Sequence, residues 1–107
     1  LASANGWGPT TGYGGAIIDV KTQKAVVEIA KKRGVLVISD EIYKAFHYDG
    51  PPRSPAEHDS NVIVIEGFGK TYGITGWRLG YAHGPKPIVD EMMKLQQFTY
   101  VCAPSFS

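Results

Sequence analysis

Two short, uninterrupted apolar runs, at residues 35–39 and 61–65, constrain the fold of this 107-residue chain more than any other feature. Both are rich in Val and Ile, and neither alternates with polar residues. A continuous run of this length is typical of a β-strand that is covered on both faces, as strands are in α/β sheets. We therefore predict that both runs are buried strands.

Residues 19–33 have a different periodicity, which predicts a helix directly before the first strand. Asp19 is a suitable N-cap, and Gly34 follows three basic residues at a position where helices often end in a left-handed residue. Four apolar residues at helical spacing predict the buried face of this helix. They are Ala25, Val26, Ile29 and Ala30.

The remaining segments complete an α/β order. The first fifteen residues are predicted to be a glycine-rich loop, and residues 47–60 an exposed loop rich in turn-forming residues. Residues 79–82 predict a third strand, which precedes a helix opened by Pro87. The apolar stripe of that helix is predicted to be Ile88, Met92 and Leu95. The predicted fold class is α/β, a layered sheet with flanking helices.

The composition argues against several kinds of partner. Eleven basic and ten acidic residues are interspersed and give a formal charge of +1, so no basic surface for nucleic acid is expected. Cys102 is the single cysteine, and no Cys or His spacing indicates a metal site. No apolar run approaches the roughly 20 residues that a membrane span needs. We expect a cytoplasmic protein without nucleic-acid, membrane or metal partners.

Polar side chains follow the predicted strands at the points where they end. Asp40 and Tyr43 come after the first strand, Lys70 comes after the second, and Arg78 directly precedes the third. Ligands of open α/β sheets bind beyond the carboxyl ends of the strands. A carboxylate, a phenol, an amine and a guanidinium gathered there suit an anionic, aromatic ligand that carries a carbonyl group, and pyridoxal phosphate has these properties.

Three of these side chains match separate parts of that cofactor. A lysine amine such as that of Lys70 forms a Schiff base with an aldehyde. A carboxylate such as that of Asp40 favours a protonated pyridine nitrogen, which lets the ring accept electrons. The guanidinium of Arg78 offers a fixed fork of donors to a phosphate.

Each residue taken alone also has a purely structural explanation. Lys70 is explained as a solvated surface lysine, Asp40 as the cap of a following turn, and Arg78 as one half of a surface ion pair. The joint spacing of these residues favours the cofactor hypothesis.

Three strings in this order are typical of one enzyme family: VISDEIY at 37–43, GFGKTYGITGWRLGY at 67–81, and GP at 84–85. With them the chain resembles the fold type I pyridoxal-phosphate-dependent aminotransferases of class I/II, in the branch that acts on aspartate and aromatic amino acids. The resemblance covers residues 15–107. It implies a single partial domain, a central segment of the large domain of such an enzyme.

The resemblance also implies a role for each site residue. Lys70 is the Schiff-base lysine and the base that moves the substrate proton, Asp40 pairs with the pyridinium nitrogen, and Tyr43 hydrogen-bonds the phenolic oxygen of the ring. Arg78 holds the phosphate, and residues 16–107 form the cofactor-binding core. The expected substrates are an amino acid and a 2-oxo acid. We expect a homo-oligomer for a different reason, because a sheet cut from a larger domain leaves unpaired edges and uncovered apolar faces.

The chain also departs from the family pattern. Gly67 and Gly69 stand where the family offers hydroxyl groups to the phosphate, and Gly8 stands where it carries a ring-contacting Asn. The glycine-rich phosphate loop, the ring-stacking residue and the substrate-carboxylate arginine have no counterpart here. An alternative hypothesis is therefore an isolated folded fragment without catalytic activity, which self-associates through exposed sheet edges.

Overall fold

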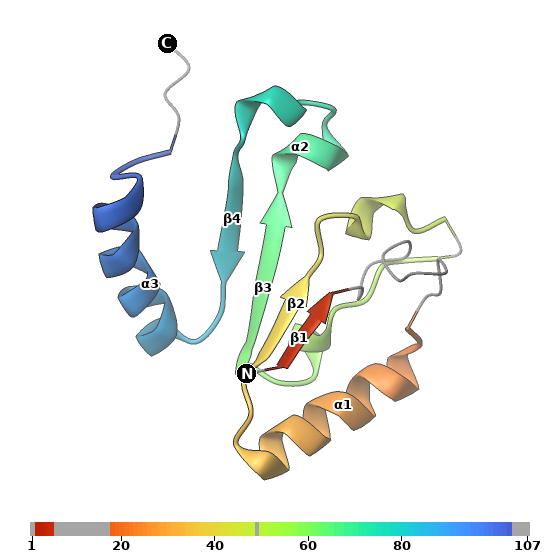
Figure 1. Ribbon diagram of the computed structural model, residues 1–107. Coiled ribbons are helices and arrows are strands. Elements are labelled where there is room, and N and C mark those ends of the chain that lie inside the picture. Colours follow the sequence, from red (N-terminus) through yellow and green to blue (C-terminus); the bar gives the residue numbers. More distant parts are fainter. Residues whose placement is uncertain (1, 6–17, 49, 104–107) are drawn as a thin grey trace.

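The computed structural model describes residues 2–5, 18–48 and 50–103 of the chain (Figure 1). Strands and α-helices follow in the order β1 (Ala2–Asn5), α1 (Val20–Arg33), β2 (Val37–Asp40), β3 (Val62–Gly67), α2 (Phe68–Thr71), β4 (Gly80–His83) and α3 (Lys86–Thr99). Three single turns of 3₁₀ helix lie in the connections: η1 (Lys44–Phe46), η2 (Pro55–Glu57) and η3 (Thr75–Trp77).

The four strands form one sheet in the order β1-β2-β3-β4. The first three strands are parallel, and β4 runs antiparallel to β3. In this register Asp40 pairs with Ile65, and Gly67 pairs with Gly80. The α/β prediction is confirmed, and each of the three predicted strands lies within two residues of its predicted bounds.

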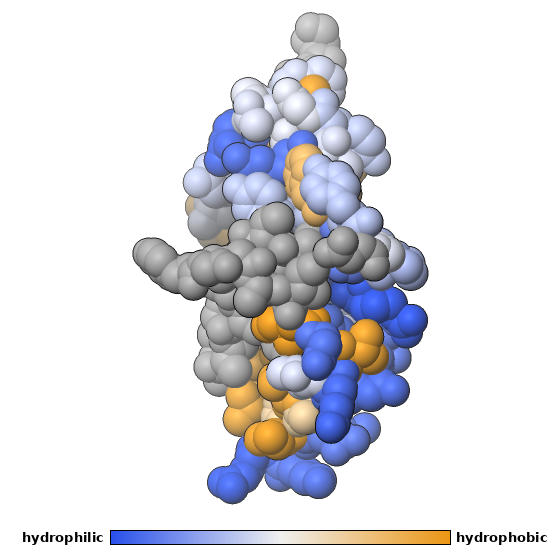
Figure 2. Space-filling view, turned by 90° about the vertical axis from the view of Figure 1, so that its right-hand side faces the viewer, coloured by the Kyte–Doolittle hydropathy of each residue, from blue (hydrophilic) through white to orange (hydrophobic). Residues whose placement is uncertain are grey.

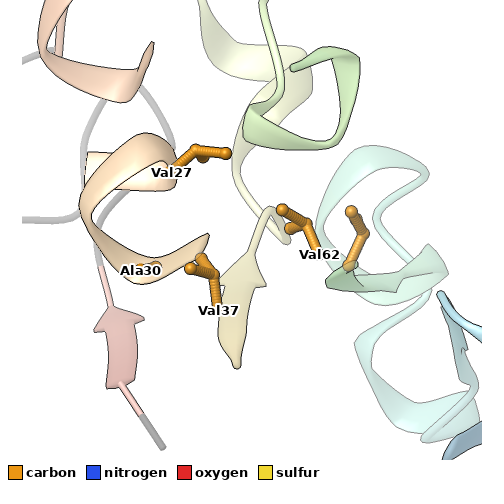
Figure 3. Close-up of a cluster of buried hydrophobic side chains, with 5 residues drawn as sticks. Val27, Ala30, Val37 and Val62 are labelled. Atoms are coloured by element: carbon orange, nitrogen blue, oxygen red, sulfur yellow. The ribbon is translucent and has the colours of Figure 1, made fainter. Parts of the chain in front are cut away.

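The core lies between α1 and the middle of the sheet (Figure 3). Val27 and Ala30 of α1 pack with Val37 of β2 and with Val62 and Val64 of β3. All five are buried, and Val64 is only 1% exposed. The two apolar runs therefore form neighbouring central strands, as predicted, but they are not covered along their whole length: Val35 is 36% exposed and Ile65 is 41% exposed.

The buried face of α1 differs from the predicted one. Ala25 and Ile29 are exposed, Ile29 to 61%, while Gln23 and Val27 are buried beside Ala30. The buried stripe follows the spacing i, i+4, i+7, and Gln23 is accommodated because its Nε2 donates to the Ile18 carbonyl at 3.1 Å. Figure 2 shows hydrophilic and hydrophobic residues side by side on the lower part of the molecule, where α1 lies.

The α3 helix begins at Lys86 and has Pro87 in its first turn, as predicted. Its expected apolar stripe is covered only at Ile88, which is half-buried; Met92 and Leu95 are exposed. The helix lies beyond β4 in Figure 1, away from the α1 core. The helix is therefore amphipathic in sequence, but its apolar stripe is largely unpacked, because no second apolar layer among the described residues covers it. None of the described helices is long and apolar enough to cross a membrane.

The prediction of a loop over the first fifteen residues is wrong at Ala2–Asn5, which form β1. This strand pairs in parallel with all four residues of β2. Its sequence ASAN alternates small apolar and polar residues but contains no β-branched or aromatic residue, so its side chains give only a weak strand signal. Backbone pairing with β2 supplies the strand instead. The rest of the predicted loop, residues 1 and 6–15, lies outside the described residues.

The predicted boundaries of α1 are confirmed at both ends. Asp19 is extended and its Oδ1 accepts a hydrogen bond from the Thr22 amide at 2.7 Å, while Gly34 adopts a left-handed conformation with φ of 63°. The hydrogen bonds from Thr22 hold the pKa of the Asp19 carboxyl below its ordinary value of 3.8. The charged form of Asp19 therefore stabilises the folded state.

Replacing Asp19 with asparagine is expected to remove part of the acid sensitivity of the fold. Because the folded-state pKa is lowered, the contribution of the charge is complete above the unfolded pKa and is lost as the pH falls through the folded pKa. Asn is also a good N-cap but has no charge to lose. The midpoint temperature of unfolding should therefore be lower for Asp19→Asn than for the wild type at pH 6, and the two midpoints should converge near pH 2. A gap that persists unchanged at low pH would contradict this role.

Candidate functional site

Four sequence-predicted residues reach the same edge of the sheet. Asp40 ends β2, and α2, with Lys70, begins directly after β3 ends at Gly67. Parallel strands have their carboxyl ends at one edge, and β4 starts at that edge because it is antiparallel to β3. Arg78, two residues before the start of β4 at Gly80, therefore arrives there too. In Figure 1 this edge, which we call the rim, lies at the top of β2, β3 and β4.

Lys70 and Tyr43 are in direct contact at the rim. The Lys70 Nζ lies 5.6 Å from the centroid of the Tyr43 ring, within the range of a cation–π interaction. Lys70 is exposed and Tyr43 is half-buried. The amine is therefore held over an aromatic ring yet stays accessible to a ligand from solvent.

Asp40 has a local structural role at the carboxyl end of β2. Its Oδ1 accepts a hydrogen bond from the Ile42 amide at 3.2 Å, which is the turn-capping contact considered from the sequence. This contact orients the half-buried carboxylate. A carboxylate has two acceptor oxygens, so the same side chain can cap the turn and face a ligand.

One shallow depression of about 240 Å³ is lined mainly by residues of the segment 66–80, among them Lys70, Thr75 and Arg78. The Arg78 Nη1 donates to the Thr75 carbonyl at 3.4 Å, and its backbone is left-handed, with φ of 52°. A left-handed conformation costs a non-glycine residue about 1 kcal/mol, and such strain concentrates at ligand sites. The lining also includes Glu66, but the exposed guanidinium and amine outnumber this one carboxylate and can bind an anion.

The glycines before Lys70 are explained by close packing. A Cβ atom at position 67 would lie 3.2 Å from Ile42 Cδ1, and one at position 69 would lie 3.3 Å from Thr75 Cα. A side chain at either position would require its neighbour to shift by a few tenths of an ångström. Phosphate contacts at this rim would therefore come from Arg78 and from the hydroxyl-bearing Thr75, and the set of donors fits a phosphorylated aromatic aldehyde.

Glu41 was missed in the sequence analysis and is the most deeply buried acid of the described residues, at 3% exposure. Its Oε1 accepts hydrogen bonds from Ser39 Oγ at 3.0 Å and from Ser54 Oγ at 2.5 Å. Its Oε2 lies 2.9 Å from Lys44 Nζ. The only sequence signals were its position beside Asp40 and its i,i+3 spacing to Lys44, which do not by themselves indicate burial.

Lys44 extends this network to β3 and β4. Its Nζ also lies 3.7 Å from Glu66 Oε1, and Tyr81 donates its hydroxyl proton to Glu66 Oε2 at 2.5 Å. Burial alone would lower the pKa of Lys44, but the hydrogen bond and charge of Glu41, with the charge of Glu66, raise it above 10.5. The hydrogen bond to Glu66 raises the pKa of Tyr81 above 10.0. Lys44 is therefore a charged bridge between two carboxylates.

Comparison with known proteins gives one consistent answer. The family described as aminotransferase class I and II matches residues 14–107. The chain is 34% identical over 99 residues to a probable aspartate aminotransferase of Methanocaldococcus jannaschii, covering 87% of the chain and 26% of that protein. It is 38% identical over 96 residues to the aspartate aminotransferase of Sulfolobus acidocaldarius, covering 87% of the chain and 24% of that protein.

Solved structures agree with these relatives. Aspartate aminotransferase from Thermus thermophilus with maleate superposes with a TM-score of 0.83 at 28% identity, over 96% of this chain and 26% of that one. An aromatic aminotransferase from Pyrococcus horikoshii gives a TM-score of 0.76 at 33% identity, over 82% of this chain and 24% of that one. The chain thus spans about a quarter of the length of the proteins that it matches.

Proposed function

Because the chain belongs to the class I and II aminotransferases, we propose that its rim binds pyridoxal phosphate and serves the transfer of an amino group between an amino acid and a 2-oxo acid. The observation that carries the proposal is the contact of the Lys70 amine with the Tyr43 ring, 5.6 Å from Nζ to centroid. That contact lies at the sheet edge where Asp40 and Arg78 also arrive.

In this proposal each side chain has one task. Lys70 would supply the amine that holds the aldehyde group of the cofactor, and its Nζ would act as the base for the proton on the substrate α-carbon. Asp40 stabilises the positive charge of the ring nitrogen, Tyr43 donates its hydroxyl proton to the ring oxygen, and Arg78 binds the phosphate. When bound, the protonated ring accepts electrons from the substrate carbon. A cytoplasmic location stays a prediction.

Titration of the chain with pyridoxal phosphate tests the proposal. The absorbance change that accompanies bonding of the aldehyde to an amine should saturate at one equivalent per chain. A subsequent addition of amino acid should release pyridoxamine phosphate if this segment alone supports the half-reaction. An absorbance change that grows without saturation, as with the urea-unfolded chain, would refute a specific site.

Replacing Arg78 with glycine is expected to weaken the binding of pyridoxal phosphate by about 10- to 100-fold, the usual contribution of charge-assisted hydrogen bonds. Glycine tolerates the left-handed backbone at this position, so the loop geometry is kept. Pyridoxal, which lacks the phosphate, serves as the control ligand and should bind the variant and the wild type equally. Equal losses for both ligands would mean that Arg78 acts through the fold and not through the phosphate.

A second candidate function is supported by the surface of α3 and the segment after it. Large apolar side chains are exposed there, and β1 and β4 are the edge strands of the described sheet. The exposed residues are Met92, Met93, Leu95, Phe98, Tyr100 and Val101. We propose that the chain self-associates through these surfaces, with or without turnover. A single monomeric species in sedimentation velocity would contradict it.

A further inference from the structure

Lys44 connects the two segments that carry the candidate site. It follows Tyr43 directly in the chain, whereas Glu66 lies on β3, four residues before Lys70. The Lys44 Nζ lies 2.9 Å from Glu41 Oε2 and 3.7 Å from Glu66 Oε1. The Lys44 ammonium group therefore adds a side-chain tie between the segment that bears Tyr43 and the strand that leads into α2, beside the backbone hydrogen bond from the Glu41 amide to the Ile65 carbonyl at 2.8 Å.

Both carboxylates that face Lys44 are fixed by other contacts. Glu41 is held on its own side by the hydroxyls of Ser39 and Ser54, and Glu66 is held by the hydroxyl of Tyr81 on β4. The side chains of Glu41, Lys44 and Glu66 are 2%, 30% and 26% exposed, so solvent screens these charges only in part. Both carboxylate partners of Lys44 are thus held in place by contacts of their own.

The charge of Lys44 also separates two like charges. Glu41 and Glu66 each place an oxygen within 4 Å of the same nitrogen, so without that nitrogen two negative groups would face each other across the rim. Their repulsion would act along the line that joins the Tyr43 segment to the end of β3. Removal of the Lys44 charge should therefore move Tyr43 and Lys70 apart.

We propose that Lys44 is a positioning residue: it holds the Tyr43 segment against the base of α2 and thereby keeps the Lys70 amine over the Tyr43 ring. The inference rests on the proposed function, because it states that Lys44 helps to arrange that same site for cofactor binding. The ion pairs of Lys44 among the described residues are with Glu41 and Glu66, so it acts on Tyr43 and Lys70 through these two carboxylates.

Four variants isolate this effect. Lys44→Met removes the charge and keeps the length of the side chain, and Lys44→Arg keeps the charge. Lys86→Met is the matched control, since Lys86 forms an exposed ion pair with Asp90 at 2.7 Å and begins α3, which follows the end of β4 opposite the rim. A double variant, Lys44→Met with Glu66→Gln, removes the repulsion together with the bridge and also guards against simple unfolding of the single variant.

The first readout needs no cofactor. Amide hydrogen exchange at Phe68 and Tyr72, whose amides bond to the Leu79 and Phe68 carbonyls, reports how firmly α2 is held. Exchange should be about fivefold faster in Lys44→Met, faster to a smaller extent in the double variant, which lacks the bridge but not the balance of charge, and close to wild type in Lys44→Arg and in Lys86→Met. Unchanged exchange in a folded Lys44→Met would overturn the proposal.

The second readout is the affinity of the chain for pyridoxal phosphate and for pyridoxal. Lys44→Met should weaken pyridoxal phosphate and pyridoxal by the same factor, about fivefold, because the bridge affects Lys70 and Tyr43 and not the phosphate. A loss confined to pyridoxal phosphate would refute a positioning role. If the wild-type chain takes up no cofactor, the proposed function fails, and the exchange measurement still decides whether Lys44 holds α2 to the rim.

Discussion

Replacing Lys70 with alanine is expected to weaken the binding of pyridoxal phosphate by at least about 100-fold and to leave no adduct that borohydride can fix at the rim. The reason is that the Lys70 amine supplies the covalent bond, while the other rim residues supply only hydrogen bonds and charge. The folded state should be almost unaffected, because Lys70 is exposed and its cation–π contact with Tyr43 contributes at most about 1 kcal/mol.

The matched control is Lys94→Ala. Lys94 is also an exposed helical lysine, and it pairs with Glu91 at 2.6 Å on α3. This variant should bind the cofactor as the wild type does. Equal binding by Lys70→Ala and Lys94→Ala would show that no single lysine defines the site, whereas a loss of folding in Lys70→Ala would show that its contact with Tyr43 is a structural one.

Replacing Glu41 with alanine is expected to destabilise the fold by about 3 kcal/mol. Glu41 is almost fully buried, and three groups depend on it: the hydroxyls of Ser39 and Ser54 and the ammonium of Lys44. Its removal leaves buried hydroxyls without their acceptor and a half-buried cation without its nearest anion. The midpoint of urea unfolding measures the loss.

Glu91→Ala is the control for that experiment, because the Glu91–Lys94 pair is exposed on both sides. Exposed pairs usually change the free energy of unfolding by less than about 1 kcal/mol. Glu41→Gln should lie between the two, since it keeps one acceptor for the serines and loses the charge that faces Lys44. A Glu41→Ala protein as stable as Glu91→Ala would mean that the buried network does not support the fold.

Features of the fold that depend on local sequence could be predicted well. The N-cap at Asp19, the left-handed Gly34 and the two apolar runs each follow from the chemistry of a few neighbouring residues. The buried stripe of α1 could not, because Ile29 and Val27 are equally apolar and only the packing against Val37 and Val62 decides which of them is covered.

Features that depend on distant partners were missed. The strand Ala2–Asn5 exists because β2 offers a free row of backbone groups, which a sequence of small residues does not reveal. The same holds for Glu41, whose acceptors are satisfied partly by Ser54, thirteen residues away in the chain. Local patterns indicate whether a segment is a helix or a strand, whereas tertiary contacts decide where the element ends and which of its charged side chains are buried.

The candidate site shows the same division. Polar residues after consecutive strands predicted a common rim, and the parallel pairing of β2 and β3 confirms that Asp40 and the start of α2 lie at one edge. The antiparallel direction of β4, which brings Arg78 to that edge, was not predicted. The bridge through Lys44 was also missed, because it depends on the register that sets Glu66 beside the Tyr43 segment.

The most direct test of the rim as a cofactor site is to treat the wild-type chain with one equivalent of pyridoxal phosphate, reduce it with borohydride and map the label among its eight lysines. The amine held over Tyr43 should carry nearly all of the label, so peptides with Lys70 should be modified and those with Lys21, Lys24 or Lys94 should not. A label spread over the exposed lysines, with Lys70 no more modified than the rest, would contradict the account.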